Sequence, residues 1–516
     1  MSSAWLLVVC LLLLATALPA AGQVTAWFAP SASKVLRDAK PVPAPRWELA
    51  AARNEVEACQ LVLRAARRTT GVQVAVGPLR HSRGKGELAA SLYRVAYVPI
   101  TKERIPYPDP LPPLGPLDLR PGQAQPVWIS VRVPKQAAPG LYRGTVTVQA
   151  GKSSQELPLA VRVWDFALPD TPSCATAFGL WTDGIARQHG VAAGSPELQA
   201  LYARYYEMLL DHQVSAYTIP VDLRSPEAAR YLSDPRLTSY LIPYPADDGE
   251  LKATIAHLVA GDWFAKGYFY PLDEPVTKDA YDRLLQIGER LRRIEPRYRL
   301  VSPFFRNPDF GEGLSVYDLM AGVVNVWCPN EHFFDLEART RPYLADRRRA
   351  GDTVWWYVCC GPGSPYNNFF VEMSAMAHRT LFWQQKREGV QGLLYWSTTY
   401  WNPSAGTADP WQDMATVKDI NPNIHGDGSL LYPGKQVGVD GPVSSLRLEM
   451  IRDGIEDFEY LTLAEQRLGP EAASKYVARV CRSLTDYEQD PARLETVRRE
   501  LGTELERATA ELRSRL

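Results

Sequence analysis

The sequence predicts a multidomain protein with an N-terminal antiparallel β-sandwich, a (β/α)8 TIM-like barrel and a C-terminal helical tail. Three observations support this fold class. The chain has 516 residues, more than one ordinary domain holds. Its first part alternates apolar and polar residues with period two, between turns rich in Pro and Gly. Its middle part alternates short apolar runs with helical patterns, which is typical of parallel βα units.

The composition is that of a folded protein with a weakly charged ligand. Hydrophobic residues make up 46% and charged residues 22% of the chain, which are ordinary values for globular proteins. The 57 Lys and Arg balance the 58 Asp and Glu, so the chain has no basic surplus for nucleic acid or an anionic membrane. We therefore expect a neutral or weakly charged ligand as partner and no nucleic acid.

Residues 1–22 are expected to form a secretory signal peptide. Residues 5–14 are a short apolar core, and small residues up to Gly22 provide a cleavage site, although Lys and Arg are missing before the core. The alternative is a membrane anchor, but the run is shorter than the roughly 20 apolar residues of a span. We expect a mature protein that is secreted or periplasmic and has no membrane span.

The seven cysteines do not predict a metal site. They show no CxxC or Cys/His spacing of the kind that binds zinc, and the seven histidines are not paired at helical spacing. We therefore expect no metal and no cofactor. Cys328, Cys359 and Cys360 lie in apolar runs and are interpreted as small buried side chains. A disulfide between Cys328 and one of the neighbouring pair stays open.

The expected sandwich comprises residues 23–167. Residues 55–63, 126–133 and 142–148 show the clearest period-two alternation. Residues 107–116 are rich in Pro and are expected to form a loop. Residues 168–172 are interpreted as the linker that leaves this domain.

The expected barrel comprises residues 173–444, close to the roughly 250 residues of a (β/α)8 barrel. A helix is predicted over residues 277–294, because its apolar positions fall on one face. Eight candidate strands are predicted at residues 175–181, 215–221, 240–243, 267–272, 299–303, 323–328, 353–359 and 392–397.

The tail, residues 445–516, is expected to be helical and to pack on the barrel. Residues 446–461 have apolar helical spacing, and the helix is expected to stop near Gly469-Pro470. Arg452, Asp453, Glu456 and Asp457 lie three to four residues apart, which allows ion pairs. We interpret this face as a structural latch between the tail helix and the barrel.

The candidate chemistry lies at the carboxyl ends of the predicted strands, where barrel enzymes carry their active sites. Acidic, amide and aromatic residues dominate these ends, and the chain has no P-loop, GxGxxG or HExxH motif. This pattern favours a neutral polyol bound by stacking and hydrogen bonds.

The adjacent acids Asp273 and Glu274 are the predicted catalytic residues. A standard retaining glycosidase takes its two carboxylates from different strands, but the seventh predicted strand ends without one. An adjacent pair suits a substrate-assisted reaction, in which the 2-acetamido oxygen of the sugar attacks the anomeric carbon. In that reaction Asp273 orients the acetamido N–H and Glu274 is the general acid and base. The structural alternative is an acidic helix entry before Pro275.

Further residues at the strand ends are candidates for sugar binding. Aromatic rings suit sugar faces, and each ring is alternatively a core residue. Asp183 and Asp222 hold a hydroxyl or act as a nucleophile in one interpretation and cap loops in the other. Asn307 and Asn402 are weaker candidates of the same kind. The predicted substrate-binding set is Trp327, Tyr357, Trp396, Tyr395, Trp401, Asn330, Asp183 and Asp222.

The sequence resembles glycoside hydrolase family 123 and its uncharacterised relatives, formerly called a domain of unknown function. The resemblance spans nearly the whole chain after residue 22, and its most specific blocks are residues 270–275 and 452–460. Weaker or shorter blocks are residues 53–57 with Gln60, 139–144, 326–329, 355–357, 382–384, 392–396, 426–428 and 432–434.

The resemblance implies a β-sandwich, a (β/α)8-type barrel and a substrate-assisted β-N-acetylgalactosaminidase. It implies that Asp273 and Glu274 are the catalytic pair, while the preference for GalNAc is inherited from the family rather than visible in these residues. Two alternatives stay open. One is a glycoside hydrolase for another sugar, with Asp183 or Asp222 as partner of Glu274, and the other is a non-catalytic carbohydrate-binding protein.

Overall fold

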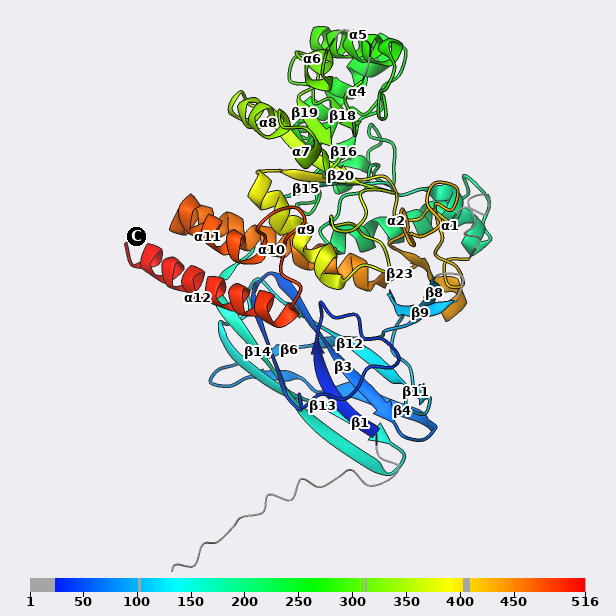
Figure 1. Cartoon of the computed structure of the whole chain (residues 1–516), viewed down its shortest axis with the longest axis vertical. Helices are drawn as coiled ribbons and strands as arrows, with labels where there is room; N and C mark the ends of the chain where they lie inside the picture. Colours follow the sequence, from blue (N-terminus) through cyan, green and yellow to red (C-terminus); the bar gives the residue numbers. More distant parts are fainter. Residues whose placement is uncertain (1–23, 101–103, 309, 311–312, 402–408, 516) are drawn as a thin grey trace, which may run out of the picture.

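The computed structural model describes residues 24–100, 104–308, 310, 313–401 and 409–515. It consists of an N-terminal β-rich part, a middle part with parallel strands and helices, and three C-terminal helices (Figure 1). The proposed signal peptide and Asn402 lie outside the described residues. No described helix is long and apolar enough to cross a membrane.

The β-rich part contains two sheets that share one apolar core. Strands from both sheets contribute to this core, for example with Leu61 and Val127 from one sheet and Val146 and Val161 from the other. One sheet has the order β1-β3-β12-β7 and the other the order β11-β4-β13-β14-β2, with β5 and β6 at its side. The strands are β1 (Val24–Pro30), β2 (Trp47–Arg53), β3 (Glu55–Ala65), β4 (Thr69–Val76), β5 (Leu79–His81), β6 (Glu87–Leu88), β7 (Ala90–Arg94), β11 (Leu117–Leu119), β12 (Ala124–Val133), β13 (Gly140–Ala150) and β14 (Ser153–Ala167).

Two details differ from the sequence prediction. The pairing of β14 with β2 is parallel, so the sandwich is not wholly antiparallel. The Pro-rich segment contains short strands rather than only a loop: β9 (Ile105–Pro108) pairs with β8 (Tyr97–Ile100), and β10 (Pro110–Leu111) pairs with β23 (Pro442–Ser445). β22 (Tyr432–Pro433) completes this last sheet, which therefore joins the sandwich to a segment just before the C-terminal helices.

The middle part contains a five-stranded parallel sheet with the order β15-β21-β20-β19-β18. Its strands are β15 (Ala175–Phe178), β18 (Val301–Phe304), β19 (Val326–Pro329), β20 (Thr353–Val358) and β21 (Gly392–Tyr395). A parallel pair, β16 (Tyr240–Leu241) and β17 (Gly267–Tyr268), lies apart from it. Single parallel bridges link Phe178 to Ala216 and Phe269 to Leu300. The regular strands thus form half a barrel rather than the complete eight-stranded barrel that the sequence predicts.

Proline explains why three of the predicted strands are so short. Pro220, Pro243 and Pro271 follow the segments around Ala216, β16 and β17 within a few residues. Proline has no N–H to donate to a ladder, so regular pairing stops before it. The predicted strand at residues 215–221 is consequently reduced to the bridge at Ala216.

Helices follow the strands in the expected alternation. The predicted helix at residues 277–294 is confirmed as α5, with Thr277 as its N-cap: its hydroxyl accepts the N–H of Ala280. The helices of this part are α1 (Thr182–His189), α2 (Pro196–Asp211), α3 (Ala228–Leu232), α4 (Asp248–Ala260), α5 (Lys278–Ile294), α6 (Val316–Met320), α7 (Phe333–Leu336), α8 (Thr340–Arg349) and α9 (Ala375–Glu388).

The C-terminal helices are α10 (Leu446–Leu468), α11 (Pro470–Val480) and α12 (Pro491–Arg515). Helix α10 lies beside α9, and α12 lies against β14 of the sandwich (Figure 1). One apolar cluster combines residues of all three regions, such as Phe166 of β14, Trp383 of α9 and Leu501 of α12. The expectation that the tail packs on the barrel is therefore incomplete, because the tail also covers the sandwich.

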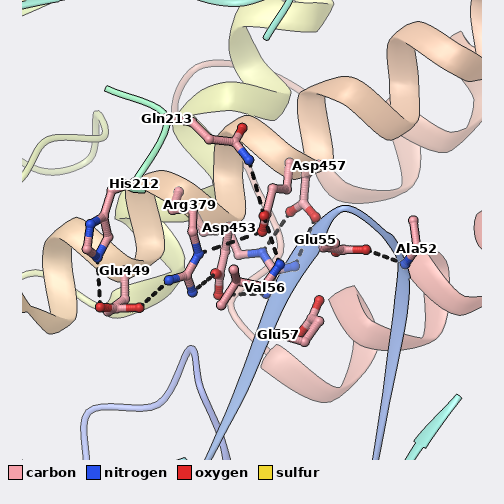
Figure 2. A network of polar contacts seen from close by, with 12 residues as sticks. Ala52, Glu55, Val56, Glu57, His212, Gln213, Arg379, Glu449, Asp453 and Asp457 are labelled. Atoms are coloured by element: carbon pink, nitrogen blue, oxygen red, sulfur yellow. Dashed lines mark hydrogen bonds and ion pairs between the residues drawn. The ribbon is translucent and has the colours of Figure 1, made fainter. Parts of the chain in front are cut away.

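A buried network of charges joins the same three regions (Figure 2). Arg498 of α12 forms ion pairs with Glu55 and Glu57 of β3 and with Asp457 of α10. The main-chain N–H of Val56 donates to Glu456 of α10 at 3.0 Å. The predicted latch is thus structural, but it binds the tail helix to the sandwich as well as to helix α9.

Candidate active site

Asp273 and Glu274 lie just after the carboxyl end of β17. Pro271 ends the strand, and the chain turns at Glu274, whose φ is 39°. A positive φ is unusual for a residue with a side chain and often marks a functional site. The Asp273 side chain is exposed and the Glu274 side chain is partly buried, so solvent and ligands reach this turn.

Each of the two acids accepts a hydrogen bond from a different tyrosine. The Tyr270 hydroxyl donates to Oδ1 of Asp273 at 2.6 Å, and the Tyr357 hydroxyl donates to Oε1 of Glu274. Tyr270 extends from β17 and Tyr357 belongs to β20, and both rings pack in the apolar cluster on one face of the parallel strands. The acids are therefore held from two strands over the same cluster.

The surroundings of Glu274 favour its protonated form. Partial burial raises the pKa of Glu274, the hydrogen bond from Tyr357 lowers it, and the negative charge of Asp273 raises it; the net direction is upward. A carboxyl group with a raised pKa keeps its proton at higher pH, as a general acid requires.

Trp396, which follows β21, is held by a buried carboxylate. Its indole N–H lies 3.2 and 3.1 Å from the two oxygens of Asp427, and the Tyr395 hydroxyl donates to the same carboxylate at 3.1 Å. Asp427 is fully buried, and burial raises its pKa to about 6. Gly426 and Gly428 on either side have φ of 80° and 68°, so the chain makes a tight turn around Asp427.

Three aromatic residues near the acids were not predicted from the sequence. Trp181 follows β15, is 47% exposed, and donates its indole N–H to the carbonyl of Trp396 at 3.1 Å. Its ring meets Tyr217 edge-on at 6.0 Å, and Tyr217 meets Tyr270 in the same way at 6.2 Å. A line of aromatic rings therefore leads from an exposed indole to the tyrosine that binds Asp273. Two of them had a signal in the sequence. Tyr270 lies two residues after Tyr268 and therefore on the same side of the strand, and Trp181 is an aromatic residue at the end of a predicted strand.

Four predicted sugar contacts lie elsewhere in the structure. Trp327 is fully buried, packs against Tyr343 and donates to Asp352 at 2.8 Å. Its neighbour Cys328 faces the cluster that contains Tyr357, so Trp327 faces the opposite side of β19. Tyr395 is turned away from Tyr357 for the same reason. We withdraw both residues from the sugar-binding set.

Trp401 and Asn330 are also buried structural residues. Trp401 packs against Tyr205, and its indole N–H donates to Ser429 at 2.9 Å. Asn330 donates to the carbonyl of Gly361 at 3.4 Å, and its side-chain oxygen lies 2.5 Å from Nδ1 of His332. These contacts brace loops, which was the alternative interpretation for Asn330.

The remaining polar candidates have different surroundings. Asp183 is exposed in the first turn of α1. Asp222 is exposed and accepts the N–H of Arg224 at 2.8 Å, as a turn-forming aspartate does. Asn307 binds Glu337 at 2.6 Å and the N–H of Val316 at 3.1 Å, so it too is occupied in a loop.

Two pockets occur elsewhere on the surface of the described residues. One of about 730 Å³ lies between the sandwich and α12, and one of about 860 Å³ lies between the sandwich and helix α2. Neither is lined by the acid pair. Among the described residues no group of three or more His, Cys, Asp and Glu is arranged to hold a metal ion. The candidate site is therefore placed by its chemistry: two adjacent acids, one with a raised pKa, over an aromatic face.

Two models of known protein families match the chain. Residues 200–464 match the catalytic domain of glycoside hydrolase 123, and residues 34–150 match the glycoside hydrolase 123 N-terminal domain. The class of protein defined by these matches is that of the glycoside hydrolases. Because the catalytic-domain match covers more than half of the chain, the protein belongs to glycoside hydrolase family 123.

One solved structure shares the fold of this chain. A family 123 glycoside hydrolase from Clostridium perfringens, studied for glycolipid glycan hydrolysis, has a TM-score of 0.73 at 13% identity, and the match covers 95% of this chain and 100% of that one. A β-glucuronidase from Parabacteroides merdae reaches a TM-score of only 0.29 at 11% identity, over 79% of this chain and 50% of that one. No curated protein sequence matches the chain.

Proposed function

We propose that this protein is a retaining, substrate-assisted exo-glycosidase that removes terminal β-N-acetylhexosamine, with β-GalNAc as the expected sugar. The observation that carries the proposal is the adjacent acid pair after β17, in which each carboxylate has its own phenol donor. Membership of family 123 supports glycoside hydrolysis, and the sugar is inferred from the resemblance of the sequence.

The proposed reaction has two steps. In the first, the acetamido oxygen of the sugar bonds to the anomeric carbon, the bond to the leaving oxygen breaks, and Glu274 gives that oxygen a proton. Asp273 accepts the acetamido N–H and stabilises the positive oxazolinium. In the second, the Glu274 carboxylate takes a proton from water and the water oxygen bonds to the anomeric carbon. The bond between that carbon and the acetamido oxygen breaks, which opens the oxazolinium ring and restores the neutral acetamido group. Two inversions leave the configuration of the sugar unchanged.

The surroundings of the acids suit these different roles. Glu274 must start with a proton, and burial together with the charge of Asp273 raises its pKa. Asp273 is exposed and accepts a hydrogen bond from Tyr270, so its carboxyl group is oriented by a phenol and accessible to a ligand. Trp396 and Trp181 offer aromatic surface next to the acids for an apolar sugar face.

The proposal extends to the architecture and the location of the protein. The bridges at Ala216 and Phe269 continue the half-barrel sheet in both directions, which supports a (β/α)8-type barrel. We also propose the domain limits 23–167, 173–444 and 445–516, and a secreted or periplasmic protein after removal of residues 1–22.

A panel of aryl glycosides with and without a 2-acetamido group tests the function. We expect cleavage of the aryl β-GalNAc glycoside, with the β-anomer as the first product seen by NMR. A thiazoline mimic of the oxazoline should inhibit. Cleavage of sugars that lack the acetamido group, with a glycosyl-enzyme trapped by a 2-fluoro sugar, would instead favour the covalent alternative.

Variants of the two acids separate their roles. Glu274→Gln should reduce kcat/KM by about 10²–10⁴ on an aryl glycoside with a poor leaving group, and by much less on one with a good leaving group, which needs no proton. Asp273→Asn should slow both substrates. Glu289→Gln on the exposed face of α5 is the matched control. Full activity in the double variant Asp273→Asn, Glu274→Gln would exclude the proposed catalytic pair.

A further inference from the structure

Two adjacent cysteines follow strand β20 directly. The Sγ atoms of Cys359 and Cys360 are 3.8 Å apart, and both side chains are partly exposed. The other described cysteines, Cys59, Cys174, Cys328 and Cys481, are buried. Cys359 and Cys360 are therefore the described thiols that combine proximity to a second thiol with access to solvent.

The cysteine pair lies in the wall of the candidate active site. Cys359 packs against the cluster of Tyr270 and Tyr357, the two phenols that bind the acids. Cys360 packs with Trp396 against a second apolar cluster around Phe370. Thus one thiol borders the tyrosines and the other borders the indole that Asp427 holds.

The two thiols differ in acidity. The hydrogen bond from Cys359 lowers the pKa of Cys360, although burial and the charges of Asp427 and Glu274 act in the opposite direction. The same contact with Cys360, together with burial, raises the pKa of Cys359. Because the thiolate is the nucleophile in thiol chemistry, Cys360 is the attacking sulfur and Cys359 the resolving one.

We infer that Cys359 and Cys360 form a redox-active dithiol in the wall of the active site, which a small-molecule disulfide converts into a bond between neighbouring cysteines. The Cys360 thiolate attacks one sulfur of the reagent, which forms a mixed disulfide on Cys360 and releases the other half of the reagent as a thiolate. Cys359 then attacks the Cys360 sulfur, the second reagent thiolate leaves, and the Cys359 proton goes to a released thiolate. The protein loses two electrons and two protons, and the reagent becomes two thiols.

The bond is expected to be reversible rather than permanently structural. Neighbouring Cα atoms are about 3.8 Å apart across a trans peptide, whereas disulfides usually span about 4.4–6.8 Å. A bond outside the usual range is strained and is more easily reduced. The 3.8 Å separation of the sulfurs must also shorten to a covalent bond, which moves sulfur atoms that pack beside Tyr357 and Trp396.

Mass spectrometry of the intact, folded protein tests the inference. After reduction and removal of the reductant, the protein is treated with bis(2-hydroxyethyl) disulfide and digested under conditions that keep disulfides. We expect the peptide with Cys359 and Cys360 to lose two hydrogen atoms and carry no adduct. Dithiothreitol should restore the original mass. The reaction requires no glycoside, so its outcome is independent of the proposed hydrolase activity.

Two serine variants assign the order of attack. Cys359→Ser lacks the resolving thiol and should keep one mercaptoethanol adduct on Cys360. Cys360→Ser lacks the attacking thiol and should remain largely unmodified. Cys481→Ser removes a buried thiol and is the control, which should behave as the unaltered protein does. The inference is overturned if Cys359 and Cys360 both stay free in the unaltered protein. It is also overturned if the peptide of Cys359→Ser or of Cys360→Ser still loses two hydrogen atoms.

Discussion

At the scale of single residues, the hydrogen bond between Tyr357 and Glu274 sets the acidity of the proposed general acid. The phenol donates to the carboxylate form and so lowers the pKa of Glu274 against the effect of burial. Without that donor the carboxyl group should hold its proton to higher pH.

Tyr357→Phe should therefore move the alkaline limb of the pH profile of kcat/KM to higher pH. The general acid is active while protonated, so activity falls as the pH rises through the pKa of Glu274, and this pKa is higher in the variant. Initial rates over the pH range measure the shift. Tyr240→Phe loses a phenol bond to the carbonyl of Trp263 and should leave the profile in place. A shift to lower pH would contradict the assigned direction.

Asp427 is a positioning residue for Trp396, because both of its oxygens lie near the indole N–H. Asp427→Asn replaces one of the two acceptor oxygens by an NH2 donor and removes the negative charge, so the indole is held less firmly. We expect KM to rise about tenfold with a smaller change in kcat, as when a ground-state contact is loosened. Thermal unfolding of the same samples separates this effect from a loss of folding. Unchanged KM in a folded variant would show that the indole does not depend on Asp427.

The acid pair of the candidate site was singled out from the sequence, whereas most of its neighbours were not. Asp273 and Glu274 follow a short apolar run, and their adjacency suggested one chemical scheme. Trp327 and Tyr395 were included because aromatic residues at strand ends suggest a sugar site, although period-two alternation turns each to the other side of its strand. Tyr270 was missed because its role depends on a hydrogen bond that spacing alone does not reveal.

At the scale of elements, the first turn of α10 holds the loop that carries Asp427. Arg447 forms a fully buried ion pair with Asp109 at 2.8 Å. It also donates to the carbonyls of Gly426 at 2.8 Å and Phe369 at 2.9 Å. This single guanidinium thus connects Asp109, which lies between β9 and β10, with helix α10 and with the turn next to Trp396.

Arg447→Met should lower the melting temperature strongly. The substitution leaves the Asp109 carboxylate buried without its partner, and breaking a buried pair in this way costs about 3–5 kcal/mol. Thermal unfolding followed by circular dichroism measures the loss. Arg482→Met breaks an exposed pair with Asp486 and should change the melting temperature little. Equal effects of the two substitutions would contradict a special role of Arg447.

Helices were easier to predict than strands in this chain. Helix α5 has a capping Thr277 and an apolar stripe, and both signals are local. Strands β16 and β17 were predicted longer than they are, because apolar runs continue past the residues that pair. The pairing of β10 with β23 joins residues more than 300 positions apart, and no local pattern indicates such a contact.

At the scale of the whole molecule, buried charges connect the sandwich, the middle part and the tail (Figure 2). Arg379, Arg452 and Arg498 face more carboxyl groups than they can neutralise. Burial consequently raises the pKa of Glu57, Asp453 and Glu456. The contact of Glu456 with Val56 of β3 is long-range, which is why the sequence suggested a latch but not its sandwich partner. The carboxyl groups of the network are Glu55, Glu57, Glu449, Asp453, Glu456 and Asp457.

Arg498→Met should destabilise the protein more at pH 8 than at pH 5. Burial raises the pKa of Glu57 in the folded state. The folded state is therefore destabilised as the pH rises above 4.5, the ordinary pKa of a glutamate, and the positive charge of Arg498 reduces this destabilisation. Without Arg498 the folded-state pKa rises further, and the deficit grows with pH. Melting temperatures of variant and unaltered protein at both pH values give the difference.

The neighbouring residue provides a matched control for this test. Arg499→Met affects an outward-facing pair with Glu48 at 3.3 Å and should show little dependence on pH. A deficit for Arg498→Met that is equal at both pH values, or larger at pH 5, would contradict the role given to Glu57.

The consecutive positions of Asp273 and Glu274 have a consequence for how the protein tolerates motion and sequence change. Where two reacting groups come from separate strands, each fluctuation of the strands relative to one another changes the distance between these groups. Here one peptide bond sets that distance, and the unusual φ of Glu274 sets the angle between the two side chains. We therefore expect an insertion or deletion inside this single turn to change the spacing of the two carboxylates, whereas substitutions elsewhere in the scaffold leave it unaltered.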